Sequence, residues 1–178
     1  EQSPRDIGAL FREVPADVKS YRVTRDAAGR WHVAFACIPA ALDGPGTGEV
    51  VGLDRGVVVS IMTSEGEAFQ APALGVKLVE RLVRLQRRLA RAVRGSNRRR
   101  RIKRAIARLR ARDTDRRKDW IEKTTTALAS HYDVLKVEDL RVKAMTASGG
   151  AAKAGLNRRI LAQGWGLFVQ RLEQKATG

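Results

Sequence analysis

Apolar and polar positions alternate along the first part of the chain in a way that is typical of β-strands. Two alternating runs, at 18–24 and 30–38, flank the Gly-containing segment Asp26–Gly29 and together predict a β-hairpin. Trp31 and every second residue after it share one face of the second run. Because a two-stranded hairpin is marginal on its own, we expect it to pack on another part of the protein.

Residues 39–48 are rich in Pro and Gly and predict a linker after the hairpin. Val50–Asp54 and Val57–Met62 follow as apolar runs on either side of Gly56, and they predict a strand, a tight turn and a second strand. The next turn leads to a short third strand near Ala68–Gln70. Three consecutive antiparallel strands followed by helices is the opening order of an RNase H-like fold.

Beyond the third strand, the spacing of apolar residues changes from two to three or four, which predicts helices. Leu78–Leu89 has a leucine at alternating steps of four and three, the stripe of an amphipathic helix. Gly95–Asn97 interrupts the pattern, and its Ser or Asn can cap a second helix that contains Ile102 and continues to Leu128. We expect residues 74–131 to form an antiparallel helical hairpin.

The last part of the chain predicts one more strand and two helices. The strand covers Asp133–Val137 and is followed, further on, by a flexible loop at 146–155. Helices are expected at 156–161 and 167–176. Between these helices, two glycines flank Trp165, which we expect to be a buried anchor whose indole N–H bonds to the backbone.

The chain is strongly basic, and its charge is concentrated. It has 178 residues, with 35 Lys and Arg against 19 Asp and Glu, and a net charge of +16. Lys77–Lys118, inside the predicted helical hairpin, holds 19 basic and 3 acidic residues, so this segment alone nets +16. Like charges at helical spacing destabilise a helix, and a polyanionic partner, most simply nucleic acid, accounts for them best. The candidate contacts are Arg84, Arg87, Arg88, Arg91, Arg94, Arg98, Arg99, Arg100, Arg101, Lys103, Arg104 and Arg108.

A solvated charged face is the alternative for this segment, but such faces usually mix both signs. Arginine-rich faces contact the phosphate backbone first, so the pattern indicates binding without indicating a base sequence. For the N-terminal β-hairpin, a structural appendage and a nucleic-acid contact are equally open.

Two carboxylates stand at the ends of predicted strands. Asp54 closes an apolar run, and Glu138 follows the strand Asp133–Val137. A carboxylate in a strand core is costly unless it is paired, hydrogen-bonded or bound to a metal. Two strands that each deliver an acid are what a metal-dependent nuclease of the RNase H/RuvC type needs. The structural alternative is a turn hydrogen bond to Asp54 and a helix cap by Glu138.

Several other chemistries are excluded. No Walker A loop, GxGxxG, HExxH or Cys/His metal cluster is present. Cys37 is the only cysteine, so cysteines of this chain provide neither an internal disulfide nor a zinc site, which suits a reducing cytoplasm. No apolar run approaches the ~18 residues of a membrane span, and no signal-peptide pattern opens the chain.

Several motifs together carry a family resemblance. Val51–Gly56 (VGLDRG) resembles the first RuvC motif of TnpB (OrfB) proteins, the accessory transposases of small bacterial insertion sequences and relatives of compact type V CRISPR effectors. Lys136–Leu140 (KVEDL) resembles the second RuvC motif, with Glu138 at the catalytic position. The family's C-terminal signature is similar to LNRRI at 156–160, GWGLF at 164–168 and LEQKA at 172–176, with Gln174 where Tyr is usual. The N-terminal hairpin resembles the last strands of the family's wedge β-barrel.

The resemblance implies an α+β fold: a RuvC (RNase H-like) mixed sheet at 44–178 with a long basic helical hairpin at 74–131, after a β-hairpin remnant of a wedge-type domain at 1–43. It implies a transposon-associated, RNA-guided DNA endonuclease whose partners are DNA and a guide RNA. Asp54 and Glu138 would be catalytic and would hold Mg²⁺ for two-metal hydrolysis. The basic hairpin would lie along the RNA–DNA duplex or the displaced strand.

The resemblance also implies parts that this sequence lacks, namely a four-Cys zinc ribbon and a third RuvC motif with its Asp. We therefore expect a truncated, catalytically incomplete copy. The alternative is a non-catalytic nucleic-acid-binding remnant that uses the Arg-rich helical hairpin, and a structural RNA-binding protein is a third possibility.

Overall fold

The computed structural model of the protein describes residues 18–36, 42–147 and 150–176. The chain divides into two compact units, Glu1–Pro39 and Ala40–Gly178. The division falls where the Pro- and Gly-rich segment begins. The rest of the predicted first domain, including Cys37 and the lead-in before residue 18, lies outside the described residues.

The first unit contains the predicted β-hairpin, which is confirmed. β1 (Tyr21–Arg25) and β2 (Trp31–Phe35) pair antiparallel. In the turn between them, Gly29 has a φ of 87°, a left-handed conformation that suits glycine. The main-chain N–H of Arg30 donates to Asp26 Oδ1 at 2.8 Å, and the guanidinium of the same residue donates to Oδ2 at 2.7 Å. These two hydrogen bonds hold the pKa of Asp26 well below its usual range.

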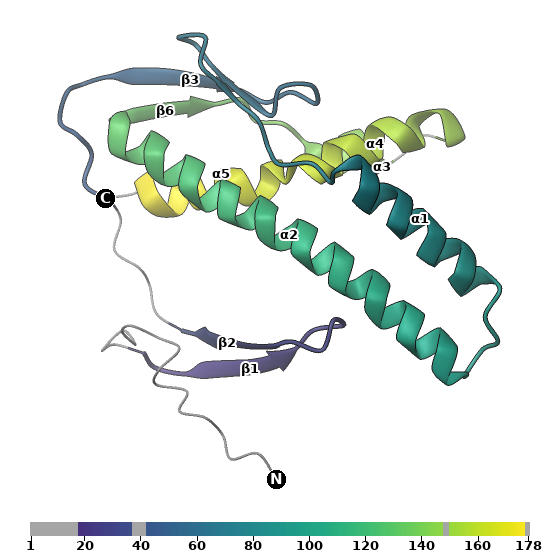
Figure 1. Ribbon diagram of the computed structural model, residues 1–178. Coiled ribbons are helices and arrows are strands. Elements are labelled where there is room, and N and C mark those ends of the chain that lie inside the picture. Colours follow the sequence, from purple (N-terminus) through teal and green to yellow (C-terminus); the bar gives the residue numbers. More distant parts are fainter. Residues whose placement is uncertain (1–17, 37–41, 148–149, 177–178) are drawn as a thin grey trace. The chain divides into compact units, whose positions relative to one another are not determined.

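Four strands form the sheet of the second unit: β3 (Val50–Asp54), β4 (Ile61–Thr63), β5 (Ala68–Phe69) and β6 (Val134–Val137). Their order across the sheet is β5-β4-β3-β6. β4 is antiparallel to both of its neighbours, whereas β6 runs parallel to β3. The sheet is therefore mixed, and the strand that follows the long helices lies beside the first strand of the unit (Figure 1).

The predicted helical hairpin is confirmed as α1 (Val76–Ala90) and α2 (Asn97–His131). Ser96 caps α2, because its hydroxyl accepts a hydrogen bond from the main-chain N–H of Arg99 at 3.2 Å. α2 has 35 residues and is therefore about 52 Å long at 1.5 Å per residue. Its first half lies beside α1, and its second half packs against α5 (Figure 1).

In the described part of the second unit, three shorter helices follow β6: α3 (Val142–Ala147), α4 (Ala151–Gln163) and α5 (Trp165–Ala176). Gly164 separates the last two and has a φ of 74°, so it ends α4 as a left-handed cap. The predicted break between two C-terminal helices is therefore confirmed.

The loop predicted at 146–155 is wrong at both of its ends, because α3 continues to Ala147 and α4 already begins at Ala151. Residues 148–149 lie outside the described part of the chain. The small residues here include several alanines, which favour helix. A side-chain contact then joins the two helices: Asn157 Nδ2 donates to the main-chain carbonyl of Thr146 at 3.3 Å.

The strand predicted at Val57–Met62 is too long, because β4 covers only its last part. Gly56 starts a bend at this point, where an added Cβ would lie 2.6 Å from the carbonyl oxygen of Val59. The carbonyl of Val57 accepts a hydrogen bond from Gln163 Nε2 at 3.3 Å. These valines therefore form a turn that is fastened to α4 and do not extend the sheet.

One core holds the sheet, α2 and α5 together. Its buried members are Val51, Leu53, Ile61, Ile121, Leu128, Tyr132, Phe168 and Leu172. Trp165 is 4% exposed, so its predicted burial is confirmed. The predicted hydrogen bond is wrong, because Trp165 Nε1 has no partner among the residues that the structure describes.

Candidate active site and nucleic-acid interface

Asp54 and Glu138 come together at one end of the sheet. β3 and β6 are parallel, and Leu53 lies opposite Val137 in their register. Asp54 and Glu138 directly follow these two residues in the sequence, so both lie at the same end of the β3–β6 pairing. The sequence predicted two acids on neighbouring strands, and the parallel pairing provides that arrangement.

Both carboxylates belong to the solvent side of the sheet. Val51 and Leu53 are buried, so the residues between and after them on β3 face the other way. Asp54, Glu138 and Lys136 line one open pocket of about 500 Å³ on this side, and all three are exposed. The pocket thus presents two acidic groups and one ammonium group to solvent.

The end of β4 and the residue after it form a further part of the wall of this open pocket. Gly52 donates its main-chain N–H to Ser64 Oγ at 3.1 Å, and the N–H of Ser64 donates back to the carbonyl of Gly52 at 2.8 Å. Thr63 lines the pocket as well. This reciprocal pair of hydrogen bonds fixes the strand ends around the two acids.

Arg55 lies directly behind the acidic pair. The side chain is 8% exposed, and its Nη2 donates to the main-chain carbonyl of Glu138. Burial lowers the pKa of the Arg55 guanidinium, while the charges of Glu138, Asp139 and Asp54 oppose that shift. The guanidinium is therefore a largely buried cation near the acidic pair.

The oxygens of both carboxylates are open to a ligand. Within the described part of the chain, neither Asp54 nor Glu138 accepts a side-chain hydrogen bond or forms an ion pair. Carboxylate oxygens are the ligands that Mg²⁺ prefers, usually with water or phosphate completing the shell. The pair fits such an ion as two ligands, and the described residues contain no group of three His, Cys, Asp or Glu that could hold one.

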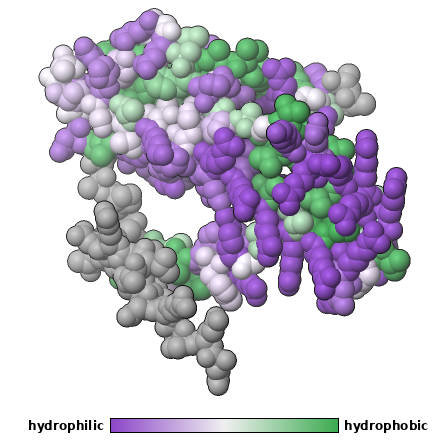
Figure 2. All heavy atoms as spheres, viewed as in Figure 1, coloured by the Kyte–Doolittle hydropathy of each residue, from purple (hydrophilic) through white to green (hydrophobic). Residues whose placement is uncertain are grey.

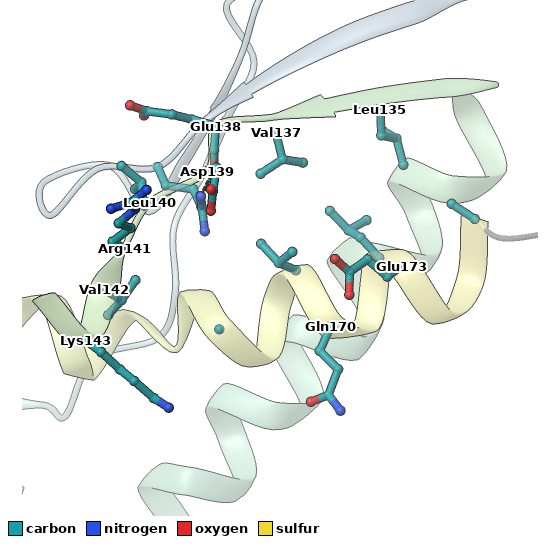
Figure 3. Close-up of a pocket in the computed structure, with 15 residues that line it drawn as sticks. Leu135, Val137, Glu138, Asp139, Leu140, Arg141, Val142, Lys143, Gln170 and Glu173 are labelled. Atoms are coloured by element: carbon teal, nitrogen blue, oxygen red, sulfur yellow. Dashed lines mark hydrogen bonds between the residues drawn. The ribbon is translucent and has the colours of Figure 1, made fainter.

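A second, larger pocket of about 930 Å³ lies between β6 and α5 (Figure 3). Leu135 and Val137 point into it from β6, and Gln170 and Glu173 belong to α5. Figure 3 shows the side chain of Glu138 directed away from this space. The acidic pair therefore faces the smaller pocket, on the other side of the strand end.

The basic residues of the predicted nucleic-acid interface lie on α1, on α2 and in their connection. Eleven of the twelve candidates are exposed: Arg84, Arg87, Arg88, Arg91, Arg94, Arg98, Arg100, Arg101, Lys103, Arg104 and Arg108. Figure 2 shows hydrophilic side chains projecting from this hairpin, with apolar patches between them. Ile102, Ile106 and Leu109 are buried on α2, so an apolar seam leaves the charged side chains facing outward.

Arg99 is the exception among these candidates. It is half-buried, and its Nη1 donates to the carbonyl of Leu89 at 2.7 Å and to that of Ala92 at 3.0 Å. Leu89 is in the last turn of α1 and Ala92 follows the helix, so Arg99 adds a side-chain donor where the helical ladder runs out. Arg99 of α2 therefore binds the C-terminal end of α1 and the connection that follows it.

The sequence-based reasoning missed three residues of the site. Lys136 was predictable, because side chains alternate along a strand and place it on the face of Glu138. Ser64 and Arg55 act through contacts with residues 12 and 83 positions away along the chain. No local pattern signals such contacts.

Comparison with known proteins identifies a family of transposon proteins. The family described as "Probable transposase" (OrfB_IS605) matches residues 33–149. A "Putative RNA-guided DNA endonuclease" of Streptomyces pristinaespiralis is 34% identical over 139 residues, which cover 78% of this chain and 35% of that protein. The "Putative RNA-guided DNA endonuclease InsQ" of Escherichia coli K12 is 34% identical over 176 residues, which cover 92% of this chain and 43% of that protein. The chain thus spans less than half the length of either relative.

Within the described residues, no helix combines the length and apolarity that crossing a membrane requires.

Proposed function

This chain belongs to the OrfB (TnpB) family, and from that premise we propose that it forms the acidic site and the nucleic-acid-binding surface of a transposon-associated, RNA-guided DNA endonuclease. The observation that carries the proposal is the parallel pairing of β3 with β6, which brings Asp54 and Glu138 to one pocket. The printed names of the two relatives support the reaction and both nucleic-acid partners.

The proposal includes an RNase H-like fold of the RuvC type for the second unit. Three antiparallel strands followed, after the long helices, by a strand parallel to the first support it. In this arrangement the acids stand where the parallel strands β3 and β6 end, and the ends of parallel strands are where open α/β sheets commonly bind their ligands.

In the proposed reaction, Asp54 and Glu138, at the ends of β3 and β6, would hold Mg²⁺. When bound, Mg²⁺ supplies a Lewis acid that activates water and offsets negative charge on the phosphate that is attacked. Lys136 lies in the same pocket, where its ammonium group pairs with a phosphate oxygen of the DNA. The exposed arginines of α1 and α2 hold the nucleic-acid backbone and so position it relative to the acids.

A second candidate function is non-catalytic nucleic-acid binding. Two-metal hydrolysis needs ligands for both ions, and the described residues offer Asp54 and Glu138 without a third acid beside them. The basic helical hairpin, with a net charge of +16 over Lys77–Lys118, would bind nucleic acid in either case.

Mn²⁺ in place of Mg²⁺ tests the metal site directly. Its unpaired electrons broaden the NMR signals of nearby amides, so a titration of the ¹⁵N-labelled chain maps where the ion binds. We expect the signals of Asp54 and Glu138 to broaden at the same Mn²⁺ concentration, and each of the variants Asp54→Asn and Glu138→Gln to lose both effects. Asp139→Asn, which changes a neighbouring exposed acid, is the matched control and should keep them. Broadening at only one of the two acids would contradict a shared site.

A cleavage assay separates the two candidate functions. Metal-dependent cutting of DNA by the chain, or by a longer protein that contains it, should be lost in Asp54→Asn while nucleic-acid binding persists. Binding without any metal-dependent cutting in either protein would favour the non-catalytic function.

A further inference from the structure

We propose that Arg55 is a positioning residue: it ties the end of β6 to the end of β3 through the main-chain carbonyl of Glu138 and so sets Glu138 opposite Asp54. This inference rests on the metal site of the proposed function and adds the device that holds its two ligands in place.

Asp54 is the last residue of β3 and pairs with Met62 of β4, but Asp54 and Glu138 both lie beyond the last residues that pair β3 with β6, Leu53 and Val137. Ladder hydrogen bonds therefore do not fix the distance between them. Arg55 follows Asp54 directly and reaches across to the carbonyl of Glu138, 83 positions later in the chain. That hydrogen bond therefore joins the two strands at a point where no main-chain hydrogen bond between β3 and β6 does so.

Arg55 and Asp54 line different pockets, and Glu138 borders both. Arg55 binds the main-chain carbonyl of Glu138, whose side chain is directed away from the larger pocket (Figure 3). The guanidinium thus holds the backbone and leaves the carboxylate oxygens free for a ligand. The carbonyl of Glu138 also accepts the N–H of Leu140 at 3.0 Å, which turns the chain toward α3.

The contact serves more than stability. Arg55 Nε is buried and has no hydrogen-bond partner among the described residues, which is a cost for the fold. A buried guanidinium keeps its charge, and it lies near Asp54, Glu138 and Asp139. Its charge offsets their mutual repulsion, but the same charge repels a metal ion. Tethering and repulsion therefore predict opposite effects on metal affinity when the residue is changed.

Two substitutions separate these effects. Arg55→Lys keeps the charge but shortens the side chain and loses the planar guanidinium, which weakens the bond to the Glu138 carbonyl. Arg55→Met loses both the bond and the charge. The half-broadening concentration, meaning the Mn²⁺ concentration at which the amide signals of Asp54 and Glu138 lose half of their intensity, is measured for each variant. Thermal unfolding of each variant is measured as well. Tethering predicts that this concentration rises at least fivefold in both variants.

Lys175→Met is the matched control, because Lys175 is another largely buried cation that donates to a main-chain carbonyl of a different element, that of Glu122 at 2.9 Å. It should lower the unfolding temperature and leave the Mn²⁺ concentration within twofold of that of the unchanged protein. A purely structural role for Arg55 would give the same pattern, with lower stability and unchanged metal binding.

The proposal would be overturned if the half-broadening Mn²⁺ concentration of Arg55→Lys equalled that of the wild-type protein. It would also be overturned if Arg55→Met bound Mn²⁺ more tightly than the wild-type protein. If Arg55→Met does not fold, Arg55→Lys decides by the same criterion. If the unchanged protein shows no common broadening at Asp54 and Glu138, the proposed metal site itself fails. If the wild-type protein shows the common broadening and the Arg55 variants show it at the same Mn²⁺ concentration, only the proposed role of Arg55 fails.

Discussion

The hydroxyl of Tyr132 donates a hydrogen bond of 2.7 Å to the carboxylate of Glu65. Tyr132 is the C-cap of α2, and Glu65 stands in the turn between β4 and β5. The bond therefore fastens the far edge of the sheet to the end of the long helix. It also raises the pKa of Tyr132 to about 12, with smaller contributions from burial and from neighbouring glutamates.

This bond predicts a loss of stability at high pH. The pKa of Tyr132 is about 12 in the folded protein and 10.0 for the ordinary group, so the folded state keeps the proton to higher pH. Its contribution is complete below about pH 10 and disappears as the pH rises toward 12. Tyr132→Phe should lower the free energy of unfolding at pH 8, and the difference from the unchanged protein should shrink between pH 10 and 12. Urea unfolding at several pH values measures it, and a difference that is constant across this range would contradict the assignment.

The basic helical hairpin predicts salt-dependent binding. If about six of its side chains meet phosphates, log K for duplex DNA should fall with log[salt] at a slope of roughly −5. A variant with six exposed arginines of the hairpin changed to Gln should have a much flatter slope; these are Arg87, Arg88, Arg98, Arg100, Arg101 and Arg104. Arg99 is left intact, because it holds the end of α1.

The control for this variant removes the same charge elsewhere. Six exposed basic residues outside Lys77–Lys118 are changed to Gln: Lys19, Arg22, Lys123, Lys143, Lys153 and Arg158. Fluorescence anisotropy at several salt concentrations compares the two sets. Equal slopes would mean that net charge alone drives binding and that the hairpin is not the interface.

The elements that the sequence predicted best are those with strong local patterns. The leucine stripe of Leu78–Leu89 and the cap at Ser96 gave α1 and the start of α2, because helix formation depends on nearby residues. The strand with Asp54 and the strand before Glu138 were also predictable, since both are short apolar runs that end in an acid.

What the sequence did not predict depends on distant contacts. Val57 and its neighbours favour strands by composition, yet the carbonyl of Val57 is held by Gln163, far along the chain. Arg99 looked like one of many phosphate-binding arginines, but it serves the carbonyl of Leu89. The role of Arg55 likewise required knowing that β6 lies beside β3.

Trp165 predicts a stability effect that is due to packing alone. It is 4% exposed and begins α5, so Trp165→Ala should cost on the order of 3 kcal/mol. Because its Nε1 has no partner among the described residues, Trp165→Phe loses volume but no hydrogen bond and should cost only about 1–2 kcal/mol. Urea unfolding measures both changes. Trp31→Ala, at a tryptophan that is 67% exposed in the other unit, should leave the unfolding of the second unit unchanged. Weakened nucleic-acid binding with normal stability in Trp165→Ala would indicate that the ring stacks on bases.

Lys136 predicts an effect on metal binding opposite in sign to that of Arg55. Its exposed side chain lines the pocket of Asp54 and Glu138, and its backbone lies opposite Gly52 in the sheet. The ammonium group forms no bond that holds the acids in place, so its charge acts on a bound cation only by repulsion, which solvent weakens.

Lys136→Met should therefore lower the Mn²⁺ concentration at which the amide signals of Asp54 and Glu138 lose half of their intensity. The expected factor is about twofold to fivefold, as for an exposed charge worth up to about 1 kcal/mol. The same variant should bind DNA more weakly, because it loses one phosphate contact. Lys123→Met is the control, since Lys123 is also exposed but pairs with Asp119 on α2. Weaker Mn²⁺ binding in Lys136→Met would mean that Lys136 helps to hold the acids in place, and unchanged DNA binding would remove it from the nucleic-acid path.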